Sequence, residues 1–242
     1  MENMNTLDDS QAQSLRSSEG QRLENVVAYI LNTLLNDKDI YIAEGTSDGL
    51  KKIISDKKIV KQIIDYNKLP VKRPCDQKQL EDYPDTDLFI LVKTKNEWRV
   101  LGIINCKLSF HSRHTMVTFW GLAIRIGSNI RYICVTEDKD QYHPTRPRSE
   151  LGKSCQQSTA ARRLLESFID RIYIIKPYKE SGDELKNDIQ KFSTIFLKQK
   201  KNAICFDNPN YKHHTKYCVS VRPFDDLIYD LLRWQEEINL TQ

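Results

Sequence analysis

Two neighbouring runs of apolar residues near the middle of the chain predict a pair of buried strands. The first run, 88–92, contains no polar residue, as expected for a strand in the middle of a sheet. Turn-forming residues follow it, and the chain returns over 99–107, whose middle, 100–104, is apolar. The pattern therefore predicts a β-hairpin.

Apolar residues at helical spacing predict helices elsewhere in the chain. A capping-box pattern at 18–21 precedes an apolar stripe that continues to Leu34, so a helix is expected there. Residues 48–66 indicate two short helices, and 113–126 indicate a helix closed by Gly127. In that helix we expect these side chains to be largely buried: Val117, Trp120, Leu122 and Ile124. The later helices are expected at 156–169, 183–199 and 224–238.

Two further apolar segments, 130–136 and 171–175, predict strands that alternate with these helices. A strand, a helix and a strand in that order imply parallel neighbours joined by a crossover. We expect a linker at 70–82 and a late hairpin at 203–221. Together with the central hairpin, the order predicts an α/β fold with a mixed central sheet flanked by helices.

The chain has 242 residues, of which 39% are hydrophobic, and this suits one domain with a substantial core. We expect residues 1–17 to be mobile, the core to occupy roughly 18–176, and 177–242 to add C-terminal helices and a hairpin. The first residues are acidic and polar, and no stretch approaches 18 consecutive apolar residues. A soluble, cytoplasmic protein that does not engage a membrane is therefore expected.

Six cysteines include no CxxC pair, and two of them lie in predicted buried strands, so reduced thiols are expected. One group has residue types that suit zinc, but its spacing matches no common ligand pattern. Its members are Cys205, His213, His214 and Cys218.

The net charge of +4 is distributed unevenly. Residues 1–47 carry three Lys or Arg against eight Asp or Glu, whereas 51–73 carry eight against two, and 198–216 contain five lysines and one aspartate. Such asymmetry allows a positive face to meet phosphates. For 51–68 alone, lysines that merely solvate helix faces are an equally good explanation.

Acidic and basic residues border the predicted hairpin. Asp85 and Asp87 precede the first strand, while Asn105 and Lys107 end the second and share one face, since side chains alternate along a strand. Oxygen ligands of this kind can hold Mg²⁺, and an ammonium can stabilise an attacking water and the charge that develops at phosphorus. The alternative is that the aspartates form a turn and that the lysine is a solvated strand end.

Residues 83–107 resemble the PD-(D/E)XK nuclease motif, and 83–138 resemble type II restriction endonucleases. In those enzymes an apolar strand is often followed by Cys-Lys and by a helix start that contains Ser and Arg, as at 105–113. This chain departs from the pattern at Asn105, where the family usually has Asp or Glu. An amide oxygen is a weaker ligand for a hard cation, so loss of activity is one outcome of this departure.

The resemblance implies a restriction-endonuclease-like core and a role for each motif residue. Asp87 would be the principal metal ligand, with Asp85 as the alternate. Lys107 would orient and activate the attacking water. Asn105 and the backbone carbonyl of Cys106 would complete the metal's surroundings.

In the resembling nucleases an N-terminal helix often lends a glutamate to the metal site, and Glu24 is the matching position here. The more ordinary role of such a residue is a solvated helix glutamate. DNA contacts are expected from residues beside the motif, in the long loop and in the late hairpin. They are Ser109, His111, Arg113, His114, Arg146, Arg148, Lys153, Asn208, Asn210, Lys212 and His213.

These features favour a Mg²⁺-dependent type II restriction endonuclease of a restriction-modification system. It would act as a homodimer whose two-fold axis matches a palindromic site in double-stranded DNA. The alternatives are a structure-selective or repair nuclease on the same fold, and a DNA-binding module whose active site has decayed at Asn105. A role without nucleic acid, with lysines only solvating the surface, also remains open.

Overall fold

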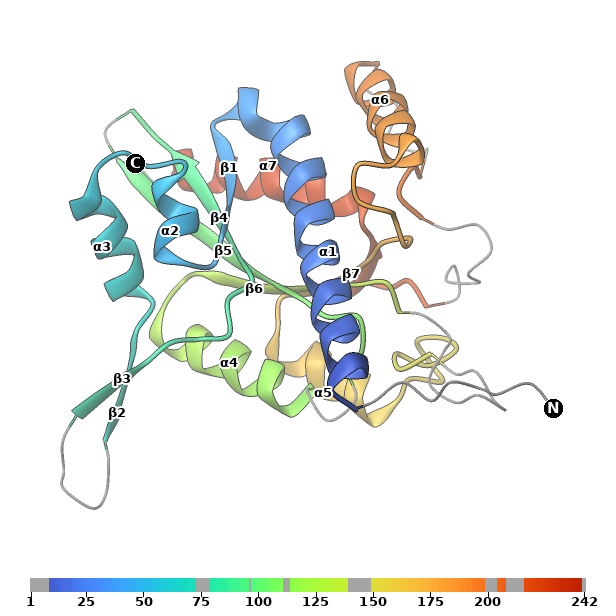
Figure 1. The fold of residues 1–242 in the computed structure, drawn as a ribbon, viewed down its shortest axis with the longest axis horizontal. Helices are drawn as coiled ribbons and strands as arrows, with labels where there is room; N and C mark the ends of the chain where they lie inside the picture. The colour runs from blue at the N-terminus through green and yellow to red at the C-terminus, as the bar shows by residue number, and fades with distance from the viewer. Residues whose placement is uncertain are drawn as a thin grey trace.

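A computed structural model of the protein describes residues 9–72, 79–95, 97–110, 114–138, 149–198, 204–207 and 216–240. Its centre is a six-stranded sheet between two layers of helices (Figure 1). In sheet order the strands are β1 (Ile40–Glu44), β4 (Leu88–Lys93), β5 (Trp98–Cys106), β6 (Arg131–Thr136), β7 (Arg171–Ile174) and β8 (Val221–Pro223).

The sheet is mixed, as predicted from the sequence. β1 pairs with β4 and β4 pairs with β5 in antiparallel register, so β4 and β5 form the expected hairpin. β5, β6, β7 and β8 are parallel neighbours, which confirms the parallel pairing expected from the strand, helix, strand order.

Helices cover both faces of the sheet, and each layer buries its own apolar cluster. One layer contains α1 (Asp9–Leu35), α6 (Asp183–Leu197) and α7 (Asp225–Leu240). The other contains α2 (Ser47–Lys51), α3 (Lys57–Tyr66), α4 (His114–Gly127) and α5 (Ala160–Phe168). Along β4, Leu88 and Ile90 belong to the first cluster, whereas Phe89 and Leu91 belong to the second. The strand lacks polar residues because both of its faces are covered.

The helix prediction for 48–66 is confirmed. Thr46 and Asp56 cap α2 and α3, since their side chains accept hydrogen bonds from the first-turn N–H groups of Gly49 and Lys58.

In α4, Val117 and Ile124 are buried as expected, but Leu122 is 38% exposed, so that part of the prediction is wrong.

The start of the first helix was predicted wrongly. The helix is continuous from Asp9, so the capping-box pattern at 18–21 lies inside it, and 9–17 are helical. The segment before Gly20 contains neither Gly nor Pro, so nothing in it opposes helix formation. Residues 1–8 lie outside the described part of the chain.

Two segments form strands that the sequence pattern did not indicate. β1, only five residues long, was missed, and the supposed linker contains an antiparallel hairpin of β2 (Leu69–Lys72) and β3 (Gln79–Asp82). Pro70 in β2 suggested a linker, but a proline is tolerated in a strand that has a free edge. A short 3-10 helix, η1 (Asn36–Lys38), joins α1 to β1.

The late hairpin at 203–221 is not seen in the described residues of that range. Of these, Val221 alone belongs to a strand, β8, which pairs in parallel with β7. Elsewhere, none of the described helices is long and apolar enough to cross a membrane. The five described cysteines are free thiols, and Cys75 lies outside the described residues.

Candidate active site

The start of β4 and the end of β5 bring the motif residues together. Leu88 pairs with Ile104, so the residues just before β4 face the last residues of β5. The Asp87 Oδ2 atom accepts a hydrogen bond of 2.6 Å from the Cys106 backbone N–H and lies 3.2 Å from Lys107 Nζ. Lys107 Nζ also lies 3.1 Å from Asp85 Oδ2. The lysine is therefore held between two carboxylates at the open end of the buried β4–β5 hairpin, opposite its turn.

Asn105 is fully buried beside these carboxylates. Its Nδ2 donates to the backbone carbonyl of Asp85 at 3.1 Å and to Asp85 Oδ2 at 3.2 Å. Its Oδ1 is buried and accepts no hydrogen bond within the described part of the chain. An unsatisfied buried oxygen is costly, and a water or a cation bound to this atom would remove that cost.

Glu24 reaches the same group from α1. Burial raises the pKa of its carboxyl to about 7, and the nearby Asp87 adds to this rise while Lys107 opposes it. The helix is tied to the sheet by Arg22, whose Nη2 lies 2.6 Å from Oε1 of the fully buried Glu137 carboxylate after β6. The charges of Asp87 and Lys107 act on the Glu24 carboxyl, and its role as a metal ligand stays a prediction.

The pKa shifts in this group reflect crowded negative charge. Burial raises the pKa of Asp87, and although Lys107 lowers it, the pKa remains above its ordinary value. Burial lowers the pKa of Lys107, but the attraction of Asp87 and Asp85 outweighs this and raises it overall. Asp85 and Asp87 both pair with Lys107, and their charges also raise the pKa of Glu24, so a bound cation would relieve the repulsion among the three carboxylates.

Sequence reasoning missed two residues that position the aspartates. The Tyr132 hydroxyl on β6 donates to the Asp85 carbonyl at 3.1 Å, and the Gly45 N–H after β1 donates to the Asp87 carbonyl at 2.8 Å. A Cβ atom on Gly45 would lie 1.8 Å from the carbonyl oxygen of Thr86, so only glycine fits there. Both residues contact backbone atoms, which no side-chain pattern reveals. The available signal was the glycine that directly follows the segment Ile40–Glu44.

The donor set suits a hard cation. Carboxylate and amide oxygens are the ligands that Mg²⁺ prefers, and Mg²⁺ keeps several waters and takes only one or two protein carboxylates. In the described ranges, no three His, Cys, Asp or Glu side chains form a ready-made metal cluster, and Lys107 lies between the two aspartates. The site therefore fits a sparsely ligated ion, with the unsatisfied Oδ1 of Asn105 as one available oxygen.

Cys106 contributes its backbone to this site and not its thiol, since its N–H donates to Asp87 Oδ2. Its thiol is buried in the cluster beneath α1, and burial raises the thiol's pKa well above the ordinary value. The zinc-type group is also divided, because Cys205 is buried in the cluster beneath α1 while Cys218 packs against the opposite one. His213 and His214 lie outside the described residues.

Three of the predicted DNA contacts fall in the described ranges. Ser109 is exposed just after Lys107, and its hydroxyl donates to Glu150 at 2.9 Å. His114 begins α4, with Nδ1 3.2 Å from the carbonyl of Phe110. Lys153 is exposed on a separate segment, 149–158. The remaining eight lie outside the described residues: His111, Arg113, Arg146, Arg148, Asn208, Asn210, Lys212 and His213.

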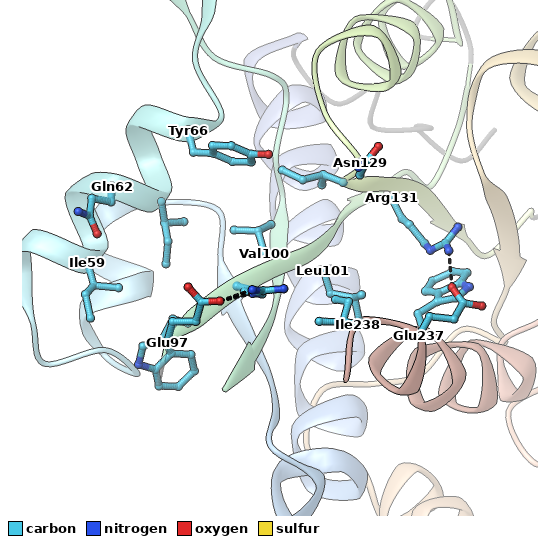
Figure 2. A pocket seen from close by; sticks show the side chains of 15 residues that line it. Ile59, Gln62, Tyr66, Glu97, Val100, Leu101, Asn129, Arg131, Glu237 and Ile238 are labelled. Carbon is cyan, nitrogen blue, oxygen red and sulfur yellow. Dashed lines mark hydrogen bonds and ion pairs between the residues drawn. The ribbon is translucent and has the colours of Figure 1, made fainter. Parts of the chain in front are cut away.

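A cavity of about 660 Å³ lies at the other end of β5, between α3, the start of β6 and α7 (Figure 2). Its charged residues neutralise one another. Glu97 pairs with Arg99, and Arg131 lies 2.8 Å from Glu237 while its guanidinium is 4.6 Å from the ring centre of Trp234. Because the acidic residues here are each matched by an arginine, the cavity lacks the excess of carboxylates found at the Asp87 site.

Comparison with known proteins finds a matching family and similar solved structures, among them two complexes of restriction endonucleases with DNA. The crystal structure of the specific restriction endonuclease AgeI–DNA complex aligns with 77% of this chain and 71% of its own, at 15% identity and a TM-score of 0.49. The pre-specific BsaWI–DNA complex aligns with 80% of this chain and 68% of its own, at 16% identity and a TM-score of 0.38. No curated protein sequence matches the chain.

The family model described as BsaWI restriction endonuclease type 2 matches residues 57–198. This range covers α3 through α6 and includes Asp85, Asp87, Asn105 and Lys107. Because the match extends over more than half of the chain, the protein belongs to the BsaWI family of type 2 restriction endonucleases.

Proposed function

We propose that this protein is a Mg²⁺-dependent endonuclease that recognises a short sequence in double-stranded DNA and hydrolyses phosphodiester bonds there. The observation that carries the proposal is Lys107, held 3.1 Å and 3.2 Å from the carboxylates of Asp85 and Asp87. A lysine is costly to bury without a charged partner, and Lys107 has two such partners directly after a buried strand. The chain also belongs to a restriction endonuclease family, which supports DNA as the substrate.

The oxygens around Lys107 would hold the metal ion. Asp87 would be the principal ligand, because its carboxylate is anchored by the Cys106 N–H and the residue lies directly before the buried strand β4. The free Oδ1 of Asn105 and the backbone carbonyl of Cys106 would complete the set, with Asp85 as the alternate to Asp87 and Glu24 as the second carboxylate. When bound, Mg²⁺ supplies Lewis acidity toward the phosphate and lowers the pKa of water.

Lys107 acts on the attacking water and on the phosphate. Its ammonium donates hydrogen bonds, so it can orient the water for in-line attack and stabilise negative charge as it develops on the phosphate oxygens. The raised pKa keeps the ammonium charged at neutral pH, which suits charge stabilisation rather than proton abstraction. The water's proton would pass to solvent or to a neighbouring oxygen.

Cleavage of both strands requires two such sites, one for each strand. A homodimer with two-fold symmetry provides them and matches the symmetry of a palindromic DNA site. Ser109, beside Lys107 and exposed, would then face the phosphates that flank the scissile bond.

A paired lysine elsewhere in the protein gives a matched control for this site. Lys107 and Lys176 have side chains that are 10% and 11% exposed, and each contacts two carboxylates; those of Lys176 belong to Glu184 and Asp188. We expect Lys107→Ala to lower the DNA cleavage rate by roughly 10²–10³-fold while DNA binding is retained, because a preorganised donor to the transition state is lost. Lys176→Ala should cleave like the wild type.

The measurement is plasmid cleavage with Mg²⁺, together with gel-shift binding and thermal unfolding of both variants. The thermal unfolding measurement shows whether a variant that no longer cleaves DNA is still folded. Full cleavage by a folded Lys107→Ala protein would contradict the assigned role of Lys107.

A further inference from the structure

A buried arginine in α5 contacts two cysteine thiols. Arg162 is fully buried, and its Nη2 lies 3.2 Å from Cys155 Sγ and 3.2 Å from Cys218 Sγ. The same nitrogen donates to the Lys216 carbonyl at 2.9 Å. The two thiols are also hydrogen-bonded to each other. Two cysteines that are distant in the sequence therefore share one permanently charged group.

The backbone on both sides of the arginine places these thiols. Cys155 lies in a turn that is closed by a β-bridge between Gly152 and Ser158. Cys218 begins a tight turn before β8, in which its N–H donates to the Val221 carbonyl at 2.8 Å. The pair is thus built into the fold.

Cys218 is the thiol with the surroundings of a nucleophile. The Val221 N–H donates to its Sγ at 3.4 Å. Its Sγ donates to Glu166 Oε1 at 3.5 Å, so this carboxylate can receive the thiol's proton. Burial raises the pKa of Cys218, but the backbone donors, the Cys155 thiol and the Arg162 guanidinium outweigh this and lower it overall. Since the thiolate is the reactive form of cysteine, Cys218 is the reactive member of the pair.

Cys155 is the thiol that keeps its proton. Its Sγ donates to the carbonyl of Tyr217 at 3.5 Å and lies 3.7 Å from that of Lys216. Burial raises its pKa, and the adjacent Cys218 adds to the rise. A protonated thiol beside a reactive one is the arrangement in which a second cysteine resolves the oxidised form of the first.

The guanidinium also has a donor that is not in use. Arg162 Nε pairs with Glu166 at 2.9 Å, but the buried Nη1 makes no hydrogen bond within the described part of the chain. A buried donor without an acceptor is costly. Oxidation of Cys218 to a sulfenic acid would add an acceptor oxygen beside this group. Cys155 and Cys218 are both partly exposed, so a small oxidant can reach them.

We propose that Cys155 and Cys218 are a peroxide-sensitive thiol pair that closes reversibly into a disulfide bond. Glu166 takes the Cys218 proton, and the thiolate attacks one oxygen of hydrogen peroxide. The O–O bond breaks, and the leaving hydroxide takes the proton from Glu166, so that a sulfenic acid and one water form.

The second step closes the disulfide. The Cys155 sulfur attacks the Cys218 sulfur, the S–O bond breaks, and the hydroxide leaves with the Cys155 proton as a second water. The two thiols together lose two electrons, and one hydrogen peroxide gains them.

Thiol titration and mass spectrometry of the purified protein, before and after treatment with hydrogen peroxide, test the pair. A Cys75→Ser background removes the cysteine that lies outside the described residues. We expect the loss of two thiols, a cross-link between the peptides that contain Cys155 and Cys218, and recovery of both thiols with dithiothreitol. Cys205 is the internal control: burial raises its pKa to about 11, so it should stay reduced.

Two cysteine variants separate the roles of the thiols. In Cys155→Ser the oxidation should stop at the sulfenic acid of Cys218, which dimedone labels. In Cys218→Ser, Cys155 should stay unlabelled, because it lacks the surroundings that favour a thiolate.

A pair of arginine variants tests the guanidinium. Arg162→Gln should slow the alkylation of Cys218 by iodoacetamide at neutral pH by about tenfold, since the thiolate loses its positive neighbour. Arg163→Gln is the matched control, because Arg163 is the exposed next residue of α5, and it should react like the wild type. Circular dichroism shows whether Arg162→Gln is folded, and the cysteine variants test the pair without it.

Three results would overturn the proposal: no loss of thiols in peroxide, a cross-link that joins other cysteines, or equal dimedone labelling of the two cysteine variants. The outcome is independent of the proposed function, because the test uses neither DNA nor Mg²⁺.

Discussion

Asn105 is fully buried beside Asp85 and Asp87, and its surroundings explain why an amide fits at this position. Its Nδ2 donates two hydrogen bonds to Asp85, one to the backbone carbonyl and one to the carboxylate. A carboxylate in its place would face those two oxygens without a proton to share. It would also add negative charge beside Asp85 and Asp87, which already share Lys107.

We therefore expect Asn105→Asp to lower the free energy of unfolding by about 1–3 kcal/mol, because buried hydrogen bonds are lost. DNA cleavage should fall as well, since the Asp85 carboxylate loses its anchor. Urea unfolding and plasmid cleavage measure the two effects. A gain of cleavage would instead favour a DNA-binding module whose active site decayed at this residue.

At the residue scale, the sequence predicted which side chains of the site lie together, but it missed the hydrogen bonds to the backbone carbonyls of Asp85 and Asp87. Asp85, Asp87 and Lys107 follow from strand alternation and hairpin pairing. Gly45 and Tyr132 bind the carbonyls of Asp87 and Asp85 from strands that are neighbours only in the folded sheet. Their contacts depend on tertiary placement, which periodicity does not reveal.

Among the elements, β1 matters for the site because the residue after it, Gly45, supports the turn that contains the aspartates through the Asp87 carbonyl. Gly45→Ala should displace Thr86, whose carbonyl oxygen would lie 1.8 Å from the new Cβ, and with it Asp85 and Asp87. We expect both lower thermal stability and a large loss of cleavage, because positioning errors at a catalytic group are costly.

Gly20→Ala is the matched control for this prediction. Gly20 lies inside α1, and a Cβ atom added there would have no neighbouring atom within 4 Å, so alanine should stabilise the protein by about 0.5–1 kcal/mol. Differential scanning calorimetry and plasmid cleavage compare the two variants. Normal cleavage by Gly45→Ala would show that β1 does not set the position of the aspartates.

The start of α7 holds the segment 204–207 through a buried carboxyl. Asp225 Oδ1 accepts from the Cys205 N–H at 2.6 Å, and Oδ2 accepts from the Phe206 N–H at 3.0 Å. Burial outweighs these bonds and raises the pKa of Asp225 from 3.8 to about 6. The folded state therefore binds this proton more tightly than the unfolded state does.

It follows that the stability contributed by Asp225 is greatest below pH 4 and declines as the pH rises from about 4 to about 6. The Asp225→Asn side chain does not titrate, and its amide NH₂ would face one of the two backbone N–H donors, Cys205 or Phe206. The Asp225→Asn protein should therefore be less stable than the wild type at every pH. Urea unfolding of both proteins across this range should show the difference shrinking as the pH rises. A difference that grows with pH would mean that the carboxylate form is preferred.

Elements with strong internal patterns were predicted, and weakly patterned ones were not. The β4–β5 hairpin, α3 and the parallel strands β6 and β7 have apolar runs or helical spacing of their own. β1 is too short to show a period, and β2 contains a proline, so both depend on pairing with distant partners. The true start of α1 was hidden because its first turns are polar.

At the scale of the whole molecule, charge distribution alone proved ambiguous. Several lysines of the basic stretch 51–73 pair locally: Lys51 with Asp48 and Lys52 with Glu44, each at 2.7 Å, and Lys68 with Asp65 at 2.8 Å. Exposed pairs of this kind solvate helix faces and contribute little energy. The case for DNA as the substrate therefore rests on the Lys107 site and on family membership rather than on net charge.

Digestion of several sequenced plasmids by the purified wild-type protein, in Mg²⁺ and in EDTA, with sequencing of the product ends, tests the proposed function most directly. The proposal predicts discrete fragments that form only with Mg²⁺ and share one short sequence at their ends. A metal-dependent smear would contradict sequence-specific cleavage and point to a structure-selective or repair nuclease. Intact DNA in Mg²⁺ would contradict catalysis itself.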